Sequence, residues 1–156
     1  LLDIDHFKEY NDSHGHLAGS QVLREAGQIL RRQASRVNGI SARYGGDEFV
    51  LVLPGTNLEG AVDVAEEIRT EIIETAFCAA SGEIQTEVLN LRGLTCSIGV
   101  ATVRAHLDED QPTEEVKGTL LRLADAAMYV AKETGRNRTA VAGQPVRRRT
   151  LGGSLA

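Results

Sequence analysis

Two short apolar runs with a pair of glycines between them are the clearest pattern in the chain. The runs are residues 40–44 and 49–53, and Gly45 and Gly46 stand between them. This arrangement predicts a β-hairpin, since glycine adopts the positive φ of a tight turn without a steric penalty. The glycines also leave no side chain in the way of a ligand, so a phosphate or sugar can approach the backbone there.

Asp47 and Glu48 follow the glycines directly, which places two carboxylates side by side at the mouth of the hairpin. Adjacent carboxylates repel each other and lose hydration in a cleft, so a functional pair shares a proton or a cation. A divalent metal ion is the natural candidate. The alternative is a solvated hairpin tip whose charges serve solubility, and this stretch alone does not separate the two interpretations.

Apolar residues spaced three and four apart predict three amphipathic helices. The first has the apolar positions Val22, Leu23, Ala26, Ile29, Leu30 and Ala34, with Ser20 as its expected N-cap. The second has Ala61, Val64, Ala65, Ile68 and Ile72. The third opens at Pro112-Thr113, carries Val116, Leu120, Leu123, Ala124, Ala127 and Ala131, and stops at Gly135.

Further strands are predicted at residues 88–91, 94–101 and 139–141, the first two joined by a turn at Arg92-Gly93. Polar or turn-rich composition predicts loops at residues 11–16, 77–87 and 106–111. Strands and helices that alternate around the hairpin predict an α/β fold, with a mixed central sheet flanked by helices.

The composition is that of one soluble globular domain. The chain has 156 residues, of which 42% are hydrophobic and 25% charged. A net charge of -5 argues against nucleic acid or a membrane surface as partner. Cys78 and Cys96 lack metal-ligand spacing, so reduced thiols and a cytoplasmic location are expected. No apolar stretch reaches the roughly 18 residues of a membrane-spanning segment.

The chain opens on apolar residues that lead straight into carboxylates. Leu1 and Leu2 resemble the end of a buried strand, and on a strand Asp3 and Asp5 point to the same side, where they form either a metal site or a polar strand exit. His14 and His16 lack a third ligand of matching spacing and are read as loop residues.

Lys132 and Arg136 bracket the predicted end of the third helix. Cations at a helix C-terminus stabilise its dipole and cap free carbonyls, which is a sufficient structural reason for both residues. The same two side chains would also clamp a polyphosphate, because arginine presents a fork to phosphate oxygens and lysine a point charge.

Several separated motifs together resemble the GGDEF family, the diguanylate cyclases. These motifs are residues 3–8 (DIDHFK), 11–12 (ND), 15–16 (GH), 43–49 (RYGGDEF), 97–99 (SIG), 124–129 (ADAAMY), 131–132 (AK) and 135–137 (GRN). The resemblance runs from Asp3 to Asn137. It implies a fold related to nucleotidyl cyclase and polymerase palm domains, with a catalytic domain at residues 1–142 and a flexible tail at 143–156.

The resemblance also implies a reaction and its partners. Two subunits of a homodimer face each other, each holding one nucleoside triphosphate, and each 3′-hydroxyl attacks the α-phosphate of the other nucleotide. Two pyrophosphates leave and a cyclic dinucleotide closes. Family domains usually begin with a helix and a complete first strand, so the chain is expected to be the output part of a longer protein with an N-terminal sensory or regulatory domain.

Roles carry over to the residues that match the motifs. Asp3, the carbonyl of Ile4, Asp47 and Glu48 are the implied ligands of two Mg²⁺ ions, for which Mn²⁺ is the expected substitute. Asp47, Glu48 and Lys8 are the implied catalytic residues, with Asp47 as proton acceptor for the 3′-hydroxyl. Lys8, Lys132 and Arg136 are implied to bind phosphates, and Asn11 the base.

The chain departs from the family where Gly19-Ser20 stands in place of Gly-Asp, the aspartate that reads guanine. A carboxylate repels the N1 lone pair of adenine, whereas a hydroxyl donates or accepts. The change resembles the hybrid promiscuous branch of the family, which makes 3′,3′-cyclic GMP-AMP beside cyclic di-GMP. It predicts use of ATP with GTP. The alternative is a GTP-only diguanylate cyclase in which Ser20 is merely a helix cap.

A second departure concerns the family's Arg-x-x-Asp site for inhibition by product. Arg36 is in place, but Gly39 supplies no carboxylate, so this inhibitory site is degenerate. Two other functions stay open at this stage: a non-catalytic nucleotide-binding regulatory module, and a one-substrate cyclase that makes cyclic AMP or cyclic GMP. The intact motif at residues 45–49 favours the dinucleotide cyclase over the regulatory module.

Overall fold

The computed structural model describes residues 1–107 and 113–145. Its elements in chain order are β1 (Leu2–Ile4), α1 (Phe7–His14), α2 (His16–Ser35), β2 (Ile40–Gly45), β3 (Glu48–Val52), α3 (Leu58–Glu74), β4 (Cys96–Val100), α4 (Val103–His106), α5 (Thr113–Glu133) and β5 (Arg138–Val141). The strands form one sheet in the order β2-β3-β1-β4-β5. Among the described residues the β4–β5 pair is parallel and the other pairs are antiparallel, so the sheet is mixed, as the sequence predicted.

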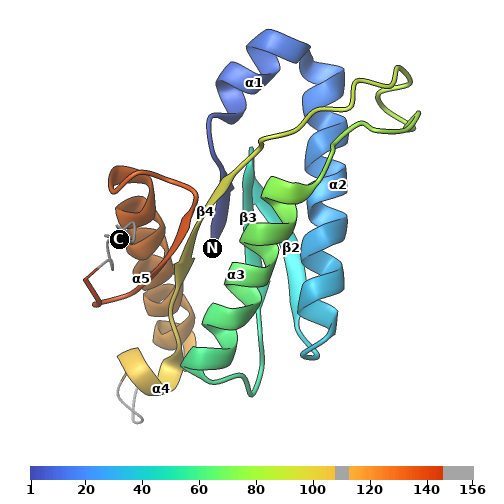
Figure 1. Cartoon of the computed structure of the whole chain (residues 1–156). Helices are drawn as coiled ribbons and strands as arrows, with labels where there is room; N and C mark the ends of the chain where they lie inside the picture. Colours follow the sequence, from blue (N-terminus) through green and yellow to red (C-terminus); the bar gives the residue numbers. More distant parts are fainter. Residues whose placement is uncertain (108–112, 146–156) are drawn as a thin grey trace, which may run out of the picture.

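Helices cover both faces of the sheet (Figure 1). The residues of β4 alternate between the two faces, as strand geometry requires. Cys96, Ile98 and Val100 belong to the main core with α2 and α3. On the other face α5 lies directly against Gly99, where an added Cβ would come within 1.9 Å of the Ala124 carbonyl oxygen. Glycine at this position therefore sets how closely α5 approaches the sheet.

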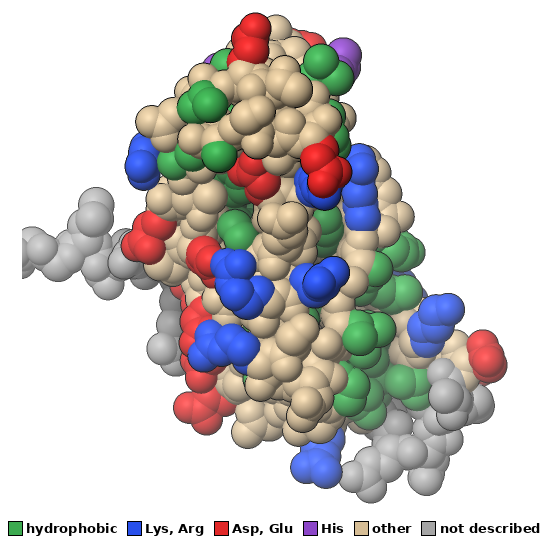
Figure 2. All heavy atoms as spheres, turned by 90° about the vertical axis from the view of Figure 1, so that its right-hand side faces the viewer, with side chains coloured by type: hydrophobic (Ala, Val, Ile, Leu, Met, Phe, Trp, Pro, Cys, Tyr) green, Lys and Arg blue, Asp and Glu red, His purple; other side chains and the backbone are tan. Residues whose placement is uncertain are grey.

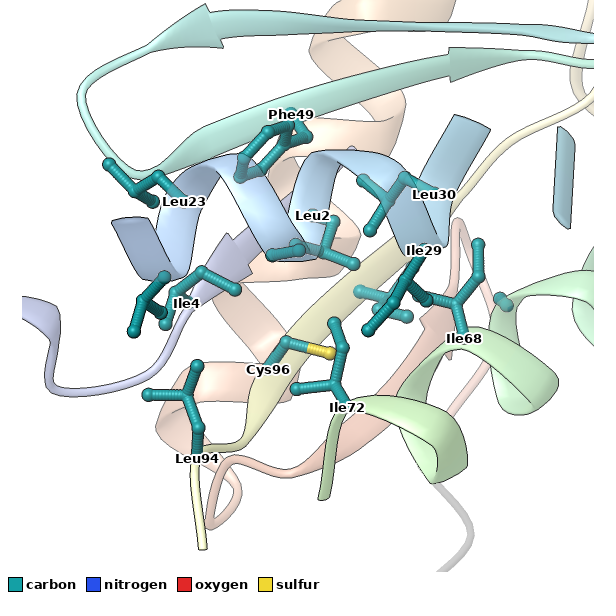
Figure 3. Packing of buried hydrophobic residues seen from close by; sticks show 14 of the residues in the cluster. Leu2, Ile4, Leu23, Ile29, Leu30, Phe49, Ile68, Ile72, Leu94 and Cys96 are labelled. Atoms are coloured by element: carbon teal, nitrogen blue, oxygen red, sulfur yellow. The ribbon is translucent and has the colours of Figure 1, made fainter. Parts of the chain in front are cut away.

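The main core fills the space between the sheet and the α2–α3 pair. Figure 3 shows Leu2, Ile4 and Cys96 of the sheet turned toward Leu30 of α2 and Ile72 of α3. Each of these five side chains is almost completely buried. A second, smaller cluster under α5 is built on alanines, namely Ala127, Ala131, Ala140 and Ala142. Small side chains there allow the close approach that Gly99 also requires.

The segment 88–91 is not a strand, which corrects the prediction from its apolar composition. The chain between α3 and β4 makes a single isolated bridge, Phe77 to Leu91. Cys78 and Asn90 adopt positive φ values of 52° and 53°, which bend the backbone out of an extended path. The amides of Leu89 and Asn90 both donate to the Cys78 carbonyl. The backbone groups of this stretch therefore find hydrogen-bond partners within the segment between α3 and β4 and do not pair with the sheet.

Residues 11–16 were also predicted wrongly, as a loop. Helix α1 continues to His14, α2 starts at His16, and Gly15 with φ 87° makes the break between them. The local preference of Asn, Asp and Ser for turns is overridden by packing. Phe7 and Tyr10 stack with ring centroids 6.3 Å apart, and Tyr10 also lies against His14.

Two exposed arginines of α2 are paired with carboxylates from other elements. Arg24 bonds Glu83 of the loop before β4, and Arg32 bonds Glu71 of α3. Lys and Arg side chains accordingly lie among Asp and Glu side chains on this face (Figure 2). In the described part of the chain, no helix combines the length and apolar character needed to cross a membrane.

Candidate active site

The pairing of β1 with β3 brings the acidic residues together. Asp3 lies opposite Glu48 in the antiparallel register, and the Ile4 amide donates to the Asp47 carbonyl at 3.3 Å. Residues more than 40 positions apart in sequence, 45 for Asp3 and Glu48 and 43 for Ile4 and Asp47, are thus neighbours at one end of two central strands. The sequence assigned all four residues to one metal site, and the fold places them side by side.

The carboxyl of Asp3 has a pKa above its ordinary value. Burial is the main cause, and the neighbouring carboxylates of Asp47 and Glu48 raise the pKa further. Lys132 opposes both effects, because its Nζ lies 2.9 Å from Asp3 Oδ2. The acidic cluster therefore recruits a cation, as carboxylates gathered in a cleft must.

The donor set fits a hard divalent ion. It consists of carboxylate oxygens from Asp3, Asp47 and Glu48, together with backbone carbonyls, and oxygen is the ligand that Mg²⁺ prefers. Across residues 1–107 and 113–145, no three His, Cys, Asp or Glu side chains converge as a preformed metal cluster. Mg²⁺ commonly takes one or two carboxylates together with substrate phosphate oxygens, so the nucleotide is expected to complete the coordination here.

The hairpin between β2 and β3 forms as the sequence predicted. Its register shifts between Arg43 and Gly45, which is a bulge, and Gly46 has a positive φ of 47°. Arg43 Nε donates to the Gly46 carbonyl at 2.7 Å and ties the tip to its own strand. A Cβ built on Gly45 or Gly46 would meet nothing within 4 Å, so the tip is open to a ligand.

A cavity of about 400 Å³ lies between this hairpin and the first two helices. Its lining residues come from α1, α2 and the hairpin, and they are Phe7, Lys8, Asn11, His16, Ser20, Leu23, Arg43, Gly46 and Asp47. A volume of this size lies within the usual range for small-molecule sites. The sequence identified Lys8, Asn11, Ser20 and Asp47 as site residues, and the fold brings them together on one cavity.

Ser20 is not the N-cap of α2, which corrects the structural explanation of this residue. The helix starts at His16 with Gly15 in the capping position, so Ser20 stands one turn inside it. Its side chain is exposed and lies on the cavity wall, on the same helix face as His16 and Leu23. The sequence did not identify His16 or Leu23 as cavity residues, because the helix was expected to begin only after Gly19.

Asn11 is seated in a gap that Gly19 leaves open. A Cβ at Gly19 would come within 1.7 Å of the Asn11 Oδ1 atom. This oxygen is buried and has no hydrogen-bond partner among the described residues. A buried acceptor without a donor is costly, so a ligand that supplies an N–H to Asn11 would satisfy it.

The two predicted phosphate ligands at the end of α5 lie beside the acidic cluster. Lys132 pairs with Asp3, and Arg136 is exposed in the turn that follows the helix. Arg136 has a φ of 57°, and its amide donates back to the Ala131 carbonyl at 2.9 Å. In the described part of the chain, the lining of the 400 Å³ cavity includes neither residue, and Lys132 contacts the acidic cluster through Asp3.

Asp5 does not join Asp3 in the acidic cluster. Strand β1 ends at Ile4, and the Asp5 carboxylate accepts hydrogen bonds from the hydroxyls of Thr95 and Ser97. The prediction that Asp3 and Asp5 point to the same side of a strand is wrong, because β1 ends one position before Asp5.

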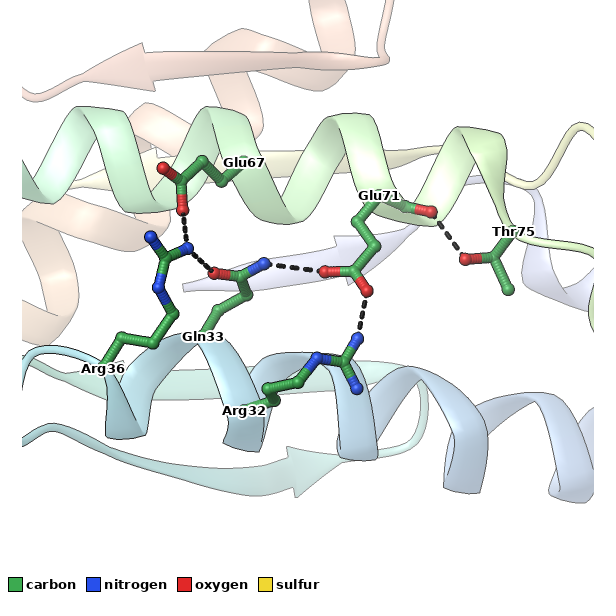
Figure 4. Close-up of polar contacts among 6 residues, drawn as sticks. All are labelled: Arg32, Gln33, Arg36, Glu67, Glu71 and Thr75. Carbon is green, nitrogen blue, oxygen red and sulfur yellow. Dashed lines mark hydrogen bonds and ion pairs between the residues drawn. The ribbon is translucent and has the colours of Figure 1, made fainter.

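The degenerate inhibitory site is closed by internal contacts. Arg36 donates to both Gln33 and Glu67, so its guanidinium bridges α2 and α3 (Figure 4). A Cβ at Gly39 would lie 2.6 Å from Leu53 Cδ2 and 2.8 Å from the Val52 carbonyl oxygen. A carboxylate at that position has no room unless the backbone moves.

The fold and the site define an α/β domain with an acidic cluster at the ends of two sheet strands, beside a cavity of about 400 Å³. The whole of residues 1–138 matches the family described as "Diguanylate cyclase, GGDEF domain". The chain therefore belongs to the GGDEF family of diguanylate cyclase domains.

Individual relatives agree with this assignment. The response regulator PleD of Caulobacter vibrioides (strain NA1000 / CB15N) is 41% identical over 139 residues, which cover 88% of this chain and 27% of PleD. The diguanylate cyclase DosC of Escherichia coli (strain K12) is 36% identical over 138 residues, covering 88% of this chain and 26% of DosC. The chain thus spans about a quarter of the length of these curated relatives.

Solved structures show the same fold. The GGDEF domain of DgcB from Caulobacter crescentus, in complex with c-di-GMP, has a TM-score of 0.73 and 34% identity, covering 92% of this chain and 75% of that one. The active GGEEF domain of a diguanylate cyclase from Vibrio cholerae has a TM-score of 0.69 and 31% identity, covering 92% and 81%.

Proposed function

We propose that this domain condenses two nucleoside triphosphates into a cyclic dinucleotide and releases two pyrophosphates, with GTP as a substrate. The observation that carries the proposal is the register of Asp3 with Glu48, which gathers the acidic residues beside a cavity of nucleotide size. A nucleotide base in the cavity would place its phosphates toward Asp3 and Asp47. The complex of the DgcB relative with c-di-GMP supports the same chemistry.

The positions of the residues in this chain suit them to metal binding, proton transfer and phosphate binding. Asp3, the Ile4 carbonyl, Asp47 and Glu48 would hold Mg²⁺, which supplies Lewis acidity to the phosphate and the attacking hydroxyl. Asp47 accepts the proton of the 3′-hydroxyl as the new phosphodiester forms. Lys8 lines the cavity and Lys132 pairs with Asp3, so both would face the phosphates, where fixed cations best meet developing negative charge.

The reaction needs two chains. A single cavity of about 400 Å³ suits one nucleotide, and the hairpin tip beside it is open. A homodimer that apposes two such sites presents each 3′-hydroxyl to the α-phosphate held by the other subunit. Arg136, exposed at the end of α5, is free to reach a triphosphate in this arrangement.

We further propose that the site accepts ATP with GTP and forms 3′,3′-cyclic GMP-AMP beside cyclic di-GMP. Ser20 lines the cavity from inside α2 and serves as no cap, so its hydroxyl is available to a base. A hydroxyl donates or accepts, and so does the carboxamide of Asn11, which means that neither side chain repels adenine. An aspartate in place of Ser20 would accept from guanine and repel adenine N1.

A product assay with equimolar ATP and GTP in Mg²⁺ tests the base preference. The parent is expected to make mixed cyclic GMP-AMP, and Ser20→Asp to return to cyclic di-GMP. Ser35→Asp is the matched control, because it adds the same charge four turns along the same helix and away from the cavity. Cyclic di-GMP alone from both parent and Ser20→Asp would make this a strict GTP enzyme.

A further inference from the structure

The carboxylate of Asp5 is buried and uses both oxygens. Thr95 Oγ1 donates to Oδ2 at 2.7 Å, Ser97 Oγ donates to Oδ1 at 2.7 Å, and the amide of Asn137 donates to Oδ2 at 3.0 Å. The side chain is only 5% exposed. A buried carboxylate that accepts three hydrogen bonds is well compensated, so Asp5 has no need of a metal ion.

One of the three donors lies 132 positions away, in the turn that joins α5 to β5. Asn137 has a positive φ of 44° and follows Arg136, whose φ is 57°. Two consecutive non-glycine residues in this region are costly and persist only where the surroundings hold them. Asp5 holds the turn by its backbone, and Arg69 Nη1 holds it by donating to Asn137 Oδ1 at 2.9 Å.

Arg69 is itself fixed by its own helix. Its Nε and Nη2 atoms bond the carboxylate of Glu66 one turn earlier on α3, and the pair raises the pKa of the guanidinium. The turn after α5 is therefore held on one side by Asp5, which directly follows β1, and on the other by Arg69 of α3.

We propose that Asp5 is a positioning residue that holds the cationic end of α5 over the triphosphate site. Lys132 pairs with Asp3, which precedes Asp5 by two residues, and Arg136 directly precedes Asn137. Asp3 and Asp5, at the end of β1, thus position both the acidic cluster and the cations at the end of α5. The proposal rests on the phosphate-binding role of Lys132 and Arg136 given above.

A charged acceptor holds the turn most firmly at this position. The hydroxyls of Thr95 and Ser97 can rotate to accept as well as donate, but the Asn137 N–H can only donate. Asparagine can direct its oxygen to the Asn137 N–H and its NH₂ group to the Ser97 hydroxyl, but its bond to the turn is then neutral and weaker than that of a carboxylate. Asp5→Asn therefore weakens the hold on the turn with little change in volume.

The test compares the affinities of a non-hydrolysable GTP analogue and of GMP, both with Mg²⁺, for the folded protein. Asp5→Asn is expected to lower the affinity for the triphosphate about tenfold and to leave that for GMP unchanged, since the cations of α5 face the outer phosphates. Ser97→Ala is the matched control. It removes one hydrogen bond from Asp5 without touching the turn, so it should lower the melting temperature and keep the ratio of the two affinities.

The outcomes separate this inference from the proposed function. If Lys132→Ala reduces the ratio of triphosphate to GMP affinity and Asp5→Asn does not, the positioning role is wrong and the phosphate role stands. If neither variant changes the ratio, both are wrong. Should Asp5→Asn not fold, Arg69→Met releases the same turn from the α3 side, and an unchanged ratio in that variant would overturn the proposal.

Discussion

The ammonium of Lys132, in the last turn of α5, lies 2.9 Å from Oδ2 of Asp3 in strand β1. Both side chains are largely buried, and the ion pair links helix α5 to strand β1. The lysine stabilises an ionised carboxylate that burial and two neighbouring carboxylates would otherwise protonate.

The raised pKa of Asp3 predicts the direction in which the stability of the fold changes with pH. Its folded-state pKa lies above the ordinary value of 3.8, so the folded protein holds this proton more tightly than the unfolded chain. Its contribution to stability is present at the lowest pH and is lost as the pH rises from 3.8 through the folded pKa. Carboxyl resonances followed by NMR should show this titration, and a midpoint for Asp3 at or below 3.8 would contradict it.

Lys132→Met should raise the pKa of Asp3 further and lower the free energy of unfolding at pH 7 by roughly 1 to 3 kcal/mol, because a buried carboxylate loses its cation. Lys117→Met, at an exposed position near the start of the same helix, is the control and should change neither quantity. Equal effects of the two substitutions, in denaturant unfolding and NMR titration, would show that the ion pair contributes nothing.

Gly99→Ala should destabilise the fold by about 3 kcal/mol, because the new Cβ would meet the backbone of α5 at Ala124 and Met128. Gly118→Ala is the matched control in α5, since a Cβ there meets nothing within 4 Å. Alanine inside a helix should stabilise it by up to about 1 kcal/mol. Thermal unfolding of the two variants should therefore shift in opposite directions.

Gly19→Ala should weaken nucleotide binding more than it weakens the fold. The added methyl would displace Asn11 from its seat on the cavity wall, so the dissociation constant for GTP should rise about tenfold. Gly27→Ala lies on the same helix, where the nearest atom to a new Cβ is 3.6 Å away, and binding should be unchanged. Isothermal titration of both variants measures the difference, and equal affinities would remove Asn11 from the base site.

Gly39→Asp should fail to restore inhibition by cyclic di-GMP. The new side chain would clash with Leu53 and the Val52 carbonyl, and Arg36 is already engaged by Glu67. The variant should instead be destabilised by about 1 to 3 kcal/mol, and Gly39→Ala by a similar amount. Product inhibition that appears in Gly39→Asp and disappears on adding Arg36→Ala would contradict this.

Patterns that depend on local repetition were predicted correctly from the sequence. The hairpin at residues 40–52 follows from Gly45-Gly46 between two apolar runs, and the three long helices follow from spacings of three and four. The mixed sheet follows from the alternation of these elements. Each of these features is set by residues close to one another in the chain.

Features that depend on specific side-chain and backbone contacts rather than on composition were missed. Residues 88–91 have the composition of a strand, but their amides turn back to Cys78, a partner that no local pattern reveals. Residues 11–14 have the composition of a turn, yet the stacking of Tyr10 on Phe7 and His14 supports a helix. The role of Asp5 depends on donors 90, 92 and 132 positions away.

The site residues were identified by resemblance rather than by pattern. Nothing local to Lys132 or Arg136 distinguishes a phosphate ligand from a cation that caps a helix. Only the fold, which sets Lys132 against Asp3, favours the first role. Ser20 shows the reverse case, because its sequence context suggested a cap and the true start of α2 removed that explanation.

The most direct test of the central claim is release of pyrophosphate from GTP in Mg²⁺, measured over a range of protein concentrations with product analysis. We expect cyclic di-GMP, a specific activity that rises with protein concentration because two sites must meet, and loss of activity in a folded Asp47→Ala variant. A parent protein that binds GTP but releases no pyrophosphate, or one whose specific activity is independent of concentration, would contradict it.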